Sequence, residues 1–181
     1  FQYLFRQKVF GRVILNTAIW TVAIVGISIV LSIILALVLN EKFKGRAFHR
    51  TVLLLPWATS LLITSAAWKY ILNTEYGALN ALLLKLGLIK KAINYLGDPV
   101  SAFTWMIIVG IVVTIPFMTF TLLSGLQSIS EDYYEAAVID GANFWDKLFK
   151  ITLPLLRPSI NVTIVLNVIY VFNSFAIVNT I

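Results

Sequence analysis

The sequence predicts an all-α protein that crosses a membrane several times, and two observations support this prediction. Of its 181 residues, 60% are hydrophobic and only 12% are charged, whereas a soluble domain carries about 25% charged residues. The apolar residues gather into long runs, and irregular backbone is costly in lipid because its polar groups find no partners. We therefore predict a polytopic helical membrane protein.

Four apolar runs are long enough to cross a bilayer, whose core takes about 20 residues of helix. They are residues 16–39, 51–72, 102–126 and 159–181. The chain begins at Phe1 without a methionine and stops inside the last run, so we interpret residues 1–181 as a single membrane domain that is truncated at both ends.

The basic residues predict which loops face the cytoplasm. Residues 41–50 hold four of them, and a short loop this basic is typically cytoplasmic. Alternation then places 73–101 outside and 127–158 inside. The 14 Lys and Arg residues divide equally between the two sides, so charge alone orients the chain weakly. Positive loops facing anionic headgroups explain the net charge of +6 better than nucleic acid does.

Prolines interrupt two of the runs, at Pro56 and Pro116. Each removes a helical hydrogen bond and can kink its helix. Two interpretations stay open: a tolerated kink, or a bend that lets a pathway open. Outside the runs, residues 78–86 are typical of a short helix, and Gly97-Asp98-Pro99 is a turn signal.

A polar segment, residues 128–154, separates the third run from the fourth, and its first residues are typical of a helix start. A serine hydroxyl caps free N–H groups, and acids in the first turn complement the helix dipole; the residues concerned are Ser130, Glu131 and Asp132. Ser128 with Glu131 also fits a capping box, so the cap position stays open. We expect a two-turn helix over 133–139.

Glycine and proline predict how this segment continues. Gly141 ends the first helix by taking positive φ, and Asn143 caps a second short helix over 144–150. Pro154 and Pro158 then break the chain before the fourth run. Two functions fit these short helices: a docking element for another subunit, or an amphipathic loop in the lipid interface, held there by Phe144, Trp145 and Phe149.

Three pieces of the segment carry a resemblance to a known family. They are Glu135-Ala136-Ala137, Gly141 and Ile151-x-Leu153-Pro154. Their order and spacing resemble the signature in the cytoplasmic loop of permease subunits of ABC importers, and every anchor is kept. Ser130 stands where this family often has proline.

Shorter pieces resemble the sugar-permease branch of this family, the maltose and glycerol-phosphate type, and the similarity extends from Asn16 to about Phe175. The pieces are Leu55-Pro56-Trp57, Gly77-x-x-Asn80-x-Leu82-Leu83-x-x-Leu86-Gly87-Leu88, Leu96-x-Asp98-Pro99, Pro116-Phe117 and Leu123-x-Gly125-Leu126-Gln127. Tyr95 departs from the pattern, because tryptophan is common there.

The resemblance implies a transport subunit in a prokaryotic cytoplasmic membrane, which translocates a sugar or related polyhydroxylated solute. It also implies a second permease subunit, an extracytoplasmic solute-binding protein, and two ATP-binding subunits that hold ATP and Mg, with no cofactor on this chain. Residues 128–154 would form a docking loop for an ATP-binding subunit. The contact residues it implies are Glu135, Ala136, Ala137, Asp140, Gly141 and Phe144.

Polar residues in the last run predict a solute pathway. Thr163, Asn167, Tyr170 and Ser174 follow one another at steps of four, three and four, which places them on one helix face. Amides inside a membrane helix need partners, which can be another helix or a watery cavity. They therefore either join helices or hydrogen-bond a sugar, and the pathway candidates are Asn167, Tyr170, Asn173 and Ser174.

Several kinds of site are missing from the sequence. It has no cysteine, one histidine (His49) and no Gly-x4-Gly-Lys-Ser/Thr phosphate loop, so we expect no metal site, no catalytic site and no ATP binding here. No carboxylate lies in an apolar run, which disfavours a secondary carrier driven by ions. That carrier, or a membrane scaffold that does not transport, is the alternative function.

Overall fold

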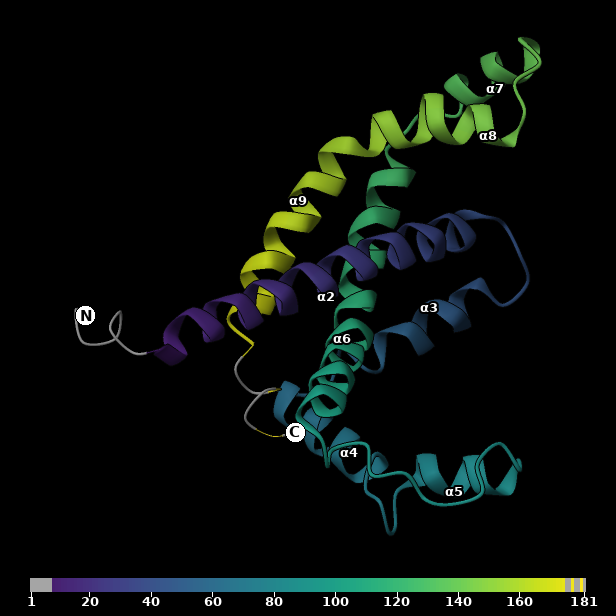
Figure 1. Ribbon diagram of the computed structural model, residues 1–181. Helices are drawn as coiled ribbons and strands as arrows, with labels where there is room; N and C mark the ends of the chain where they lie inside the picture. Colours follow the sequence, from purple (N-terminus) through teal and green to yellow (C-terminus); the bar gives the residue numbers. More distant parts are fainter. Residues whose placement is uncertain (1–7, 175–176, 178–179, 181) are drawn as a thin grey trace.

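The computed structural model describes residues 8–174, 177 and 180, and in this part of the chain it shows helices and turns without strands (Figure 1). The all-α prediction is confirmed. The elements are α2 (Lys8–Asn40), α3 (Arg46–Leu54), α4 (Leu61–Ile71), α5 (Ala78–Lys85), α6 (Pro99–Gln127), α7 (Asp132–Ile139), α8 (Phe144–Lys147), the π-helix η1 (Leu148–Thr152) and α9 (Leu153–Phe172).

Three helical stretches of the described chain are long and apolar enough to cross a membrane. They are Phe10–Asn40 in α2, Pro99–Gln127 in α6, and Phe144–Phe172, which joins α8, η1 and α9. The predicted runs 16–39 and 102–126 lie inside the first two. The fourth run, 159–181, is helical only to Phe172 in α9, and several of its last residues lie outside the described part.

The prediction of one continuous helix over 51–72 is wrong. The structure breaks this run into α3 and α4, which a turn over residues 55–60 separates. Pro56 has no N–H to give to the carbonyl of Val52, and the Leu55 N–H takes that carbonyl at 3.2 Å in a tighter turn. A proline inside the run therefore ends the first helix rather than kinking one long helix.

The prediction that Pro154 and Pro158 break the chain is also wrong. Pro154 lies in the first turn of α9, where a missing N–H is tolerated, and Pro158 lies inside that helix without ending it. Just before them, η1 widens the helix, and the Leu153 N–H reaches the carbonyl of Leu148 five residues back. The polar segment is thus continuous with the last membrane helix.

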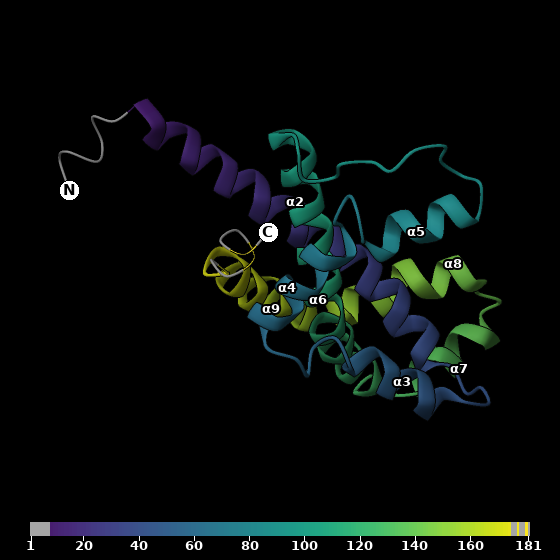
Figure 2. The same ribbon diagram turned by 90° about the horizontal axis from the view of Figure 1, so that it is seen from below.

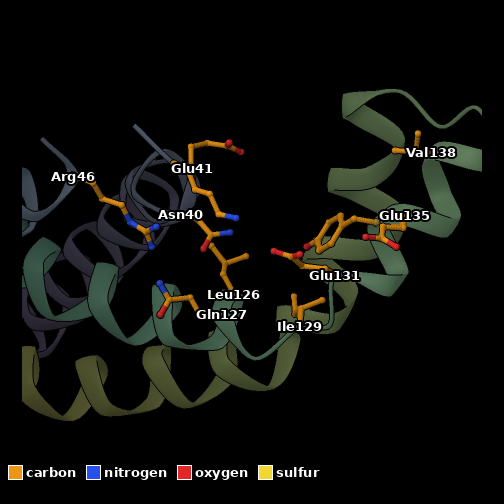
Figure 3. Close-up of a pocket in the computed structure, with 11 residues that line it drawn as sticks. Asn40, Glu41, Arg46, Leu126, Gln127, Ile129, Glu131, Glu135 and Val138 are labelled. Atoms are coloured by element: carbon orange, nitrogen blue, oxygen red, sulfur yellow. The ribbon is translucent and has the colours of Figure 1, made fainter. Parts of the chain in front are cut away.

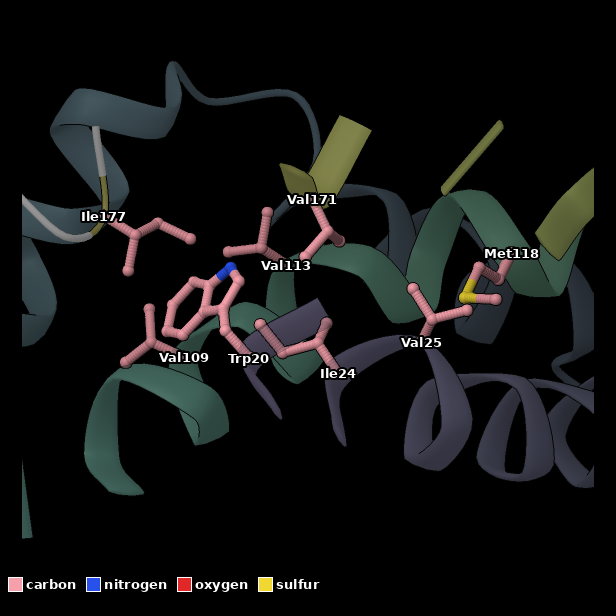
Figure 4. Packing of buried hydrophobic residues seen from close by; sticks show 8 residues of the cluster. All are labelled: Trp20, Ile24, Val25, Val109, Val113, Met118, Val171 and Ile177. Carbon is pink, nitrogen blue, oxygen red and sulfur yellow. The ribbon is translucent and has the colours of Figure 1, made fainter. Parts of the chain in front are cut away.

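The core lies where α2 and α9 pack against α6. Trp20, Ile24, Val109 and Val113 belong to one buried cluster (Figure 4). A second cluster, nearer the end of α6, contains Ala36, Leu39, Leu122, Leu123, Leu126 and Leu156. Between the helices, the hydroxyl groups of Ser28 and Thr114 lie 2.8 Å apart in a buried hydrogen bond, so even this polar contact is satisfied inside the bundle.

The elements divide between the two ends of α6. Figure 1 shows α4 and α5 near its beginning and α7 and α8 near its end, and in Figure 2 α3 and α7 gather at the end of α2. Residues 40–46 and 126–138 contribute to one cavity, so we call this side the α7 end. The predicted basic loop and polar segment therefore share one side, while 73–98 lies on the other.

Two arginines of α3 hydrogen-bond to the ends of α2 and α6 at the α7 end. Arg50 Nη2 donates to the carbonyl of Leu39 at 3.2 Å. With its amide oxygen facing the two guanidinium groups, Gln127 accepts from Arg50 at 2.8 Å and from Arg46 at 2.9 Å. These charges lie at the C-terminal ends of α2 and α6, where a helix dipole favours cations. Burial, and then the Arg46 charge, lower the pKa of Arg50.

At the other end, local hydrogen bonds organise residues 73–98. The predicted helix over 78–86 is confirmed as α5. The side chain of Asn80 pairs with the backbone of Ile93 in both directions, at 2.9 and 3.0 Å. Asp98 caps α6 by accepting from the N–H groups of Val100 and Ser101, each at 3.1 Å, which confirms the predicted turn.

Candidate functional site

The polar segment begins with α7, and the sequence favours a helix there. The Ser130 hydroxyl accepts from the Asp132 N–H at 3.3 Å and donates to the Asp132 carboxylate at 2.9 Å. Asp132 and Glu135 both lie in the first turn, where negative charge complements the helix dipole. The predicted helix over 133–139 is confirmed, with one further residue at its start.

Gly141 turns the chain after α7, and its positive φ of 75° confirms the prediction. The Ala142 N–H donates to the carbonyl of Ala137 at 2.8 Å, and the Gly141 N–H donates to that of Val138 at 3.1 Å. This pair of bonds is the Schellman arrangement, which needs a left-handed residue at the glycine position. A Cβ on Gly141 would meet no atom within 4 Å, so the requirement comes from the backbone alone.

Asn143 starts the next helix, as predicted. Its side chain accepts from the Asp146 N–H at 3.0 Å, and the Asp146 carboxylate accepts from the Asn143 N–H at 3.3 Å, which is a capping box. Asp146 also pairs with Lys150 at 2.7 Å. The predicted separate helix over 144–150 is corrected: α8 ends at Lys147, and η1 and α9 continue from it.

A hydroxyl pair ties α7 to this continuous helix. Tyr134 Oη lies 3.1 Å from Thr152 Oγ1, and Thr152 is buried in η1. Because the Thr152 hydroxyl donates to the carbonyl of Lys147 at 3.1 Å, Tyr134 is the donor of the pair. The side chain of Tyr134 thus joins α7 directly to η1, from which α9 continues.

The structure distributes the predicted docking residues between the inside and the outside of the segment. Ala137 is buried. The five exposed members are Glu135, Ala136, Asp140, Gly141 and Phe144. Val138 and Ile139 are not among the contact residues predicted from the sequence, although the Ile139 side chain is 87% exposed. Two adjacent apolar residues immediately before Asp140, in a polar segment, were the available signal.

Three aromatic residues, which follow Val138 and Ile139 a few positions later in the segment, form an exposed patch. Phe144, Trp145 and Phe149 are all exposed. The Trp145 ring meets Phe144 edge-on, with centroids 5.3 Å apart, and stacks on Phe149 at 5.9 Å. Exposed apolar groups rimmed by charge mark a contact surface, so this geometry fits either a partner subunit or the lipid interface.

A charged cavity of about 560 Å³ lies beside α7 (Figure 3). Its lining includes the acids Glu41, Glu131 and Glu135 and the bases Lys42 and Arg46. Figure 3 shows Glu131 on the α7 side and Arg46 on the α3 side of the space. Glu135 thus lines a polar cavity at the membrane end of the segment, and does not point into the core.

A second cavity, of about 270 Å³, contains two of the predicted pathway residues. Asn167 and Tyr170 line it from α9, together with Trp57, Val113, Thr114, Phe117 and Leu166. The rings of Trp57 and Phe117 stack there, with centroids 6.3 Å apart and planes inclined by 21°. Trp57 belongs to the turn that breaks the 51–72 run, so the break supplies an aromatic wall.

The other two predicted pathway residues lie elsewhere. Ser174 is buried and lines a separate cavity of about 460 Å³, next to Trp20 and Phe103. Asn173 is exposed, and its amide donates to the carbonyl of Ile169 at 2.8 Å. They part from Asn167 and Tyr170 because α9 ends at Phe172, so the helical spacing does not continue to residue 174.

Comparison with known proteins places this geometry in a family. The sequence profile of the binding-protein-dependent transport system inner membrane component matches residues 8–181. The chain belongs to this family. Its all-helical fold and its membrane location are those of an inner membrane component, and the resemblance seen in the sequence is confirmed.

Individual relatives agree with this assignment. The chain is 48% identical over 178 residues to a probable ABC transporter permease protein of Brucella suis, covering 98% of this chain and 62% of the relative. It is 42% identical over 154 residues to a trehalose/maltose transport system permease protein of Thermococcus litoralis, covering 85% of this chain and 52% of the relative. The chain thus spans less than two thirds of these relatives.

A solved structure shows the same fold. A chain in the crystal structure of a bacterial alginate ABC transporter, in complex with an alginate pentasaccharide-bound periplasmic protein, superposes with a TM-score of 0.81. The two chains are 29% identical, and the superposition covers 91% of this chain and 57% of the other. The helices described above are therefore arranged as in an importer permease.

Proposed function

We propose that this chain is a permease subunit of an ATP-driven importer, and that it translocates a sugar or related polyhydroxylated solute across the cytoplasmic membrane. The observation that carries the solute class is the cavity of Asn167 and Tyr170 with the stacked Trp57 and Phe117. Similarity to known proteins also supports the proposal, because relatives of this chain transport maltose, trehalose and alginate.

The chemistry of this cavity fits a sugar. The stacked rings of Trp57 and Phe117 supply flat apolar surface of the kind that a sugar ring can cover. The Asn167 amide nitrogen donates to the carbonyl of Thr163 at 2.9 Å, which leaves the Asn167 carbonyl oxygen to accept from a solute hydroxyl. The Tyr170 hydroxyl can both donate and accept.

The coupling of this site to ATP is proposed through the segment 128–154. An ATP-binding subunit holds α7, with Glu135 making a charge-assisted contact and Ile139 and Phe144 packing against it. Closure of the two ATP-binding subunits, which carry ATP and Mg, displaces the segment. The Tyr134–Thr152 hydrogen bond and the continuous helix from Phe144 to Phe172 support transmission of this motion to Asn167.

The remaining partners follow from the same proposal. A second permease subunit completes the pathway, and an extracytoplasmic solute-binding protein delivers the solute to the end that carries α4 and α5. The helices α2, α6 and α9 contain no carboxylate, which favours an ATP-driven subunit over an ion-driven carrier.

Replacing Asn167 with alanine, or Tyr170 with phenylalanine, is expected to weaken transport while the complex still assembles. A lost hydrogen bond is worth about 0.5–1.5 kcal/mol, which corresponds to roughly a few-fold to tenfold in apparent solute affinity. Transport in vesicles at graded solute concentrations measures it. Asn173→Ala is the matched control, because that amide lies outside the cavity and should leave affinity unchanged. Normal affinity in both cavity variants would exclude the solute contact.

Residues 1–181 contain no cysteine, so single cysteines introduced among them test the sidedness of this part of the protein. With cysteine at position 90, an impermeant thiol reagent should label intact cells. With cysteine at 44 or 147, labelling should require permeabilised cells. The variants are Lys44→Cys, Lys90→Cys and Lys147→Cys. Labelling of Lys44→Cys in intact cells, with Lys90→Cys protected, would reverse the proposed orientation.

A further inference from the structure

The helix α3 presents two different faces, and only one of them is occupied by the rest of the described chain. Arg46 and Arg50 hold one face against Gln127 and the end of α2, and Leu53 packs against the second core cluster. The other face carries Phe48 and Val52, four residues apart and both exposed. The arginines of this helix are therefore engaged, while its apolar face is open.

The open face belongs to a groove of about 430 Å³. The end of α2, the loop after it and α3 contribute the lining: Leu35, Val38, Leu39, Phe43, Phe48, His49, Val52, Leu53 and Pro56. His49 is the one polar residue among them. Its ring meets Phe43 and Phe48 edge-on, with centroids 5.5 and 5.9 Å away, and its Nδ1 lies 2.9 Å from the carbonyl oxygen of Gly45.

The groove lies at the level where a membrane helix ends. Ile34 and Val38 on α2 are exposed, so the apolar surface of this span leads directly into the groove. The loop at its rim holds Lys42 and Lys44, both exposed. The described part of the chain has one ion pair, between Asp146 and Lys150, and no acid lines the groove.

We propose that this groove is a binding site for an anionic phospholipid of the membrane. One acyl chain lies along Val38, Phe48 and Val52, and the headgroup phosphate meets Lys44, with Lys42 close by in sequence. Charge selects the occupant: Arg46 and Arg50 are engaged on the other face of α3, but the loop also presents the exposed lysines Lys42 and Lys44, and basic residues next to a membrane helix attract anionic headgroups. A neutral apolar partner would fill the groove but leave Lys44 without an anionic partner.

A lipid in this position would brace α3 from outside while Arg46 and Arg50 hold it from inside. The end of α6 at Gln127, which those arginines contact, immediately precedes the segment of α7. The bound lipid would thus stiffen the base from which α7 projects. The site is independent of which solute the transporter carries.

The test uses the complete transporter with the full-length permease, reconstituted in nanodiscs that hold phosphatidylglycerol and phosphatidylcholine of equal chain length. Native mass spectrometry after detergent extraction counts the retained lipids. Phosphatidylglycerol should be preferred, and Lys42→Gln with Lys44→Gln should lower that preference about tenfold. Val52→Trp should reduce retention of both lipids by filling the groove. The matched control is Lys90→Gln with Lys91→Gln at the other end, which should change neither.

Two results would overturn the proposal. One is that the native transporter retains phosphatidylglycerol and phosphatidylcholine equally, as the lysine variant does. The other comes from a photoreactive group on cysteine at position 52, introduced as Val52→Cys: transfer to another subunit or another part of the permease, instead of to lipid, would show that protein covers the groove. Transfer to phospholipid is the supporting result. The Val52→Cys readout stands even if the tryptophan variant fails to assemble.

Discussion

Replacing Gly141 with valine is expected to abolish coupled transport while the membrane helices still fold. The residue has φ 75°, and a left-handed conformation costs about 1–2 kcal/mol for a residue with a side chain, with β-branched residues the worst. No atom lies within 4 Å of the Cβ position, so the damage comes from the backbone. When the backbone at residue 141 relaxes to negative φ, the hydrogen bonds of the residue 141 and Ala142 N–H groups to α7 break. The exposed surface of α7 and α8 then no longer faces the ATP-binding subunit.

The measurement combines solute-stimulated ATP hydrolysis, transport in reconstituted vesicles, and co-purification of the ATP-binding subunit. Gly141→Asn is the matched control, because asparagine tolerates positive φ, and it should keep most of the coupling. Glu135→Ala should give a milder defect, since it removes one charged contact and leaves the turn intact. If ATP hydrolysis and transport stay fully coupled in Gly141→Val, the segment 128–154 is not the mechanical link between them.

Replacing Gly125 with leucine is expected to prevent stable assembly of the membrane bundle. Gly125 lies in α6 where α9 crosses it, and an added Cβ would collide with the Ser159 hydroxyl and lie 2.9 Å from Leu156 Cδ1. Leu156 is fully buried in the second core cluster, so it has no room to move. Overpacking of this kind costs about 1–3 kcal/mol or more, and a leucine adds three further carbons.

The variant should therefore accumulate poorly and lose its compact elution profile, or unfold at a clearly lower temperature in detergent. Gly26→Leu in α2 is the control, because a Cβ there meets nothing within 4 Å. Wild-type thermal stability in Gly125→Leu would mean that α6 and α9 are not packed this closely.

Local chemistry explains why some details were predictable from sequence. Gly141 and Asn143 act through bonds to residues at most five positions away, and Asp98 caps its own helix. Such contacts depend on spacing along the chain. The helix bounds of α5, α6 and α7 therefore agree with the sequence predictions to within a few residues.

Prolines show where spacing stops being sufficient. Pro56 ends a helix, Pro116 lies inside α6 without ending it, and Pro158 lies inside α9. All three lack the same N–H. What differs is the surroundings: Pro116 is buried in the packed bundle, whereas Pro56 lines the groove at the turn over residues 55–60. Packing, which the sequence does not display, decides between a break and a continuous helix.

The solute cavity required the tertiary structure for the same reason. Spacing placed Asn167 and Tyr170 on one face, and the structure keeps them together. Their aromatic neighbours come from a broken helix and from α6, far away in sequence, and Ser174 leaves the group because α9 ends first.

By itself, then, the sequence determined that this protein is an all-helical membrane protein with a glycine turn after α7, because composition and short-range hydrogen bonding suffice for both. Only the tertiary structure decided which runs stay continuous, that the polar segment is one piece with α9 through η1, and that α3 bears an open groove. Those features depend on contacts between residues far apart in the chain, such as Gln127 with Arg46 and Tyr134 with Thr152, and spacing along the sequence does not encode them visibly.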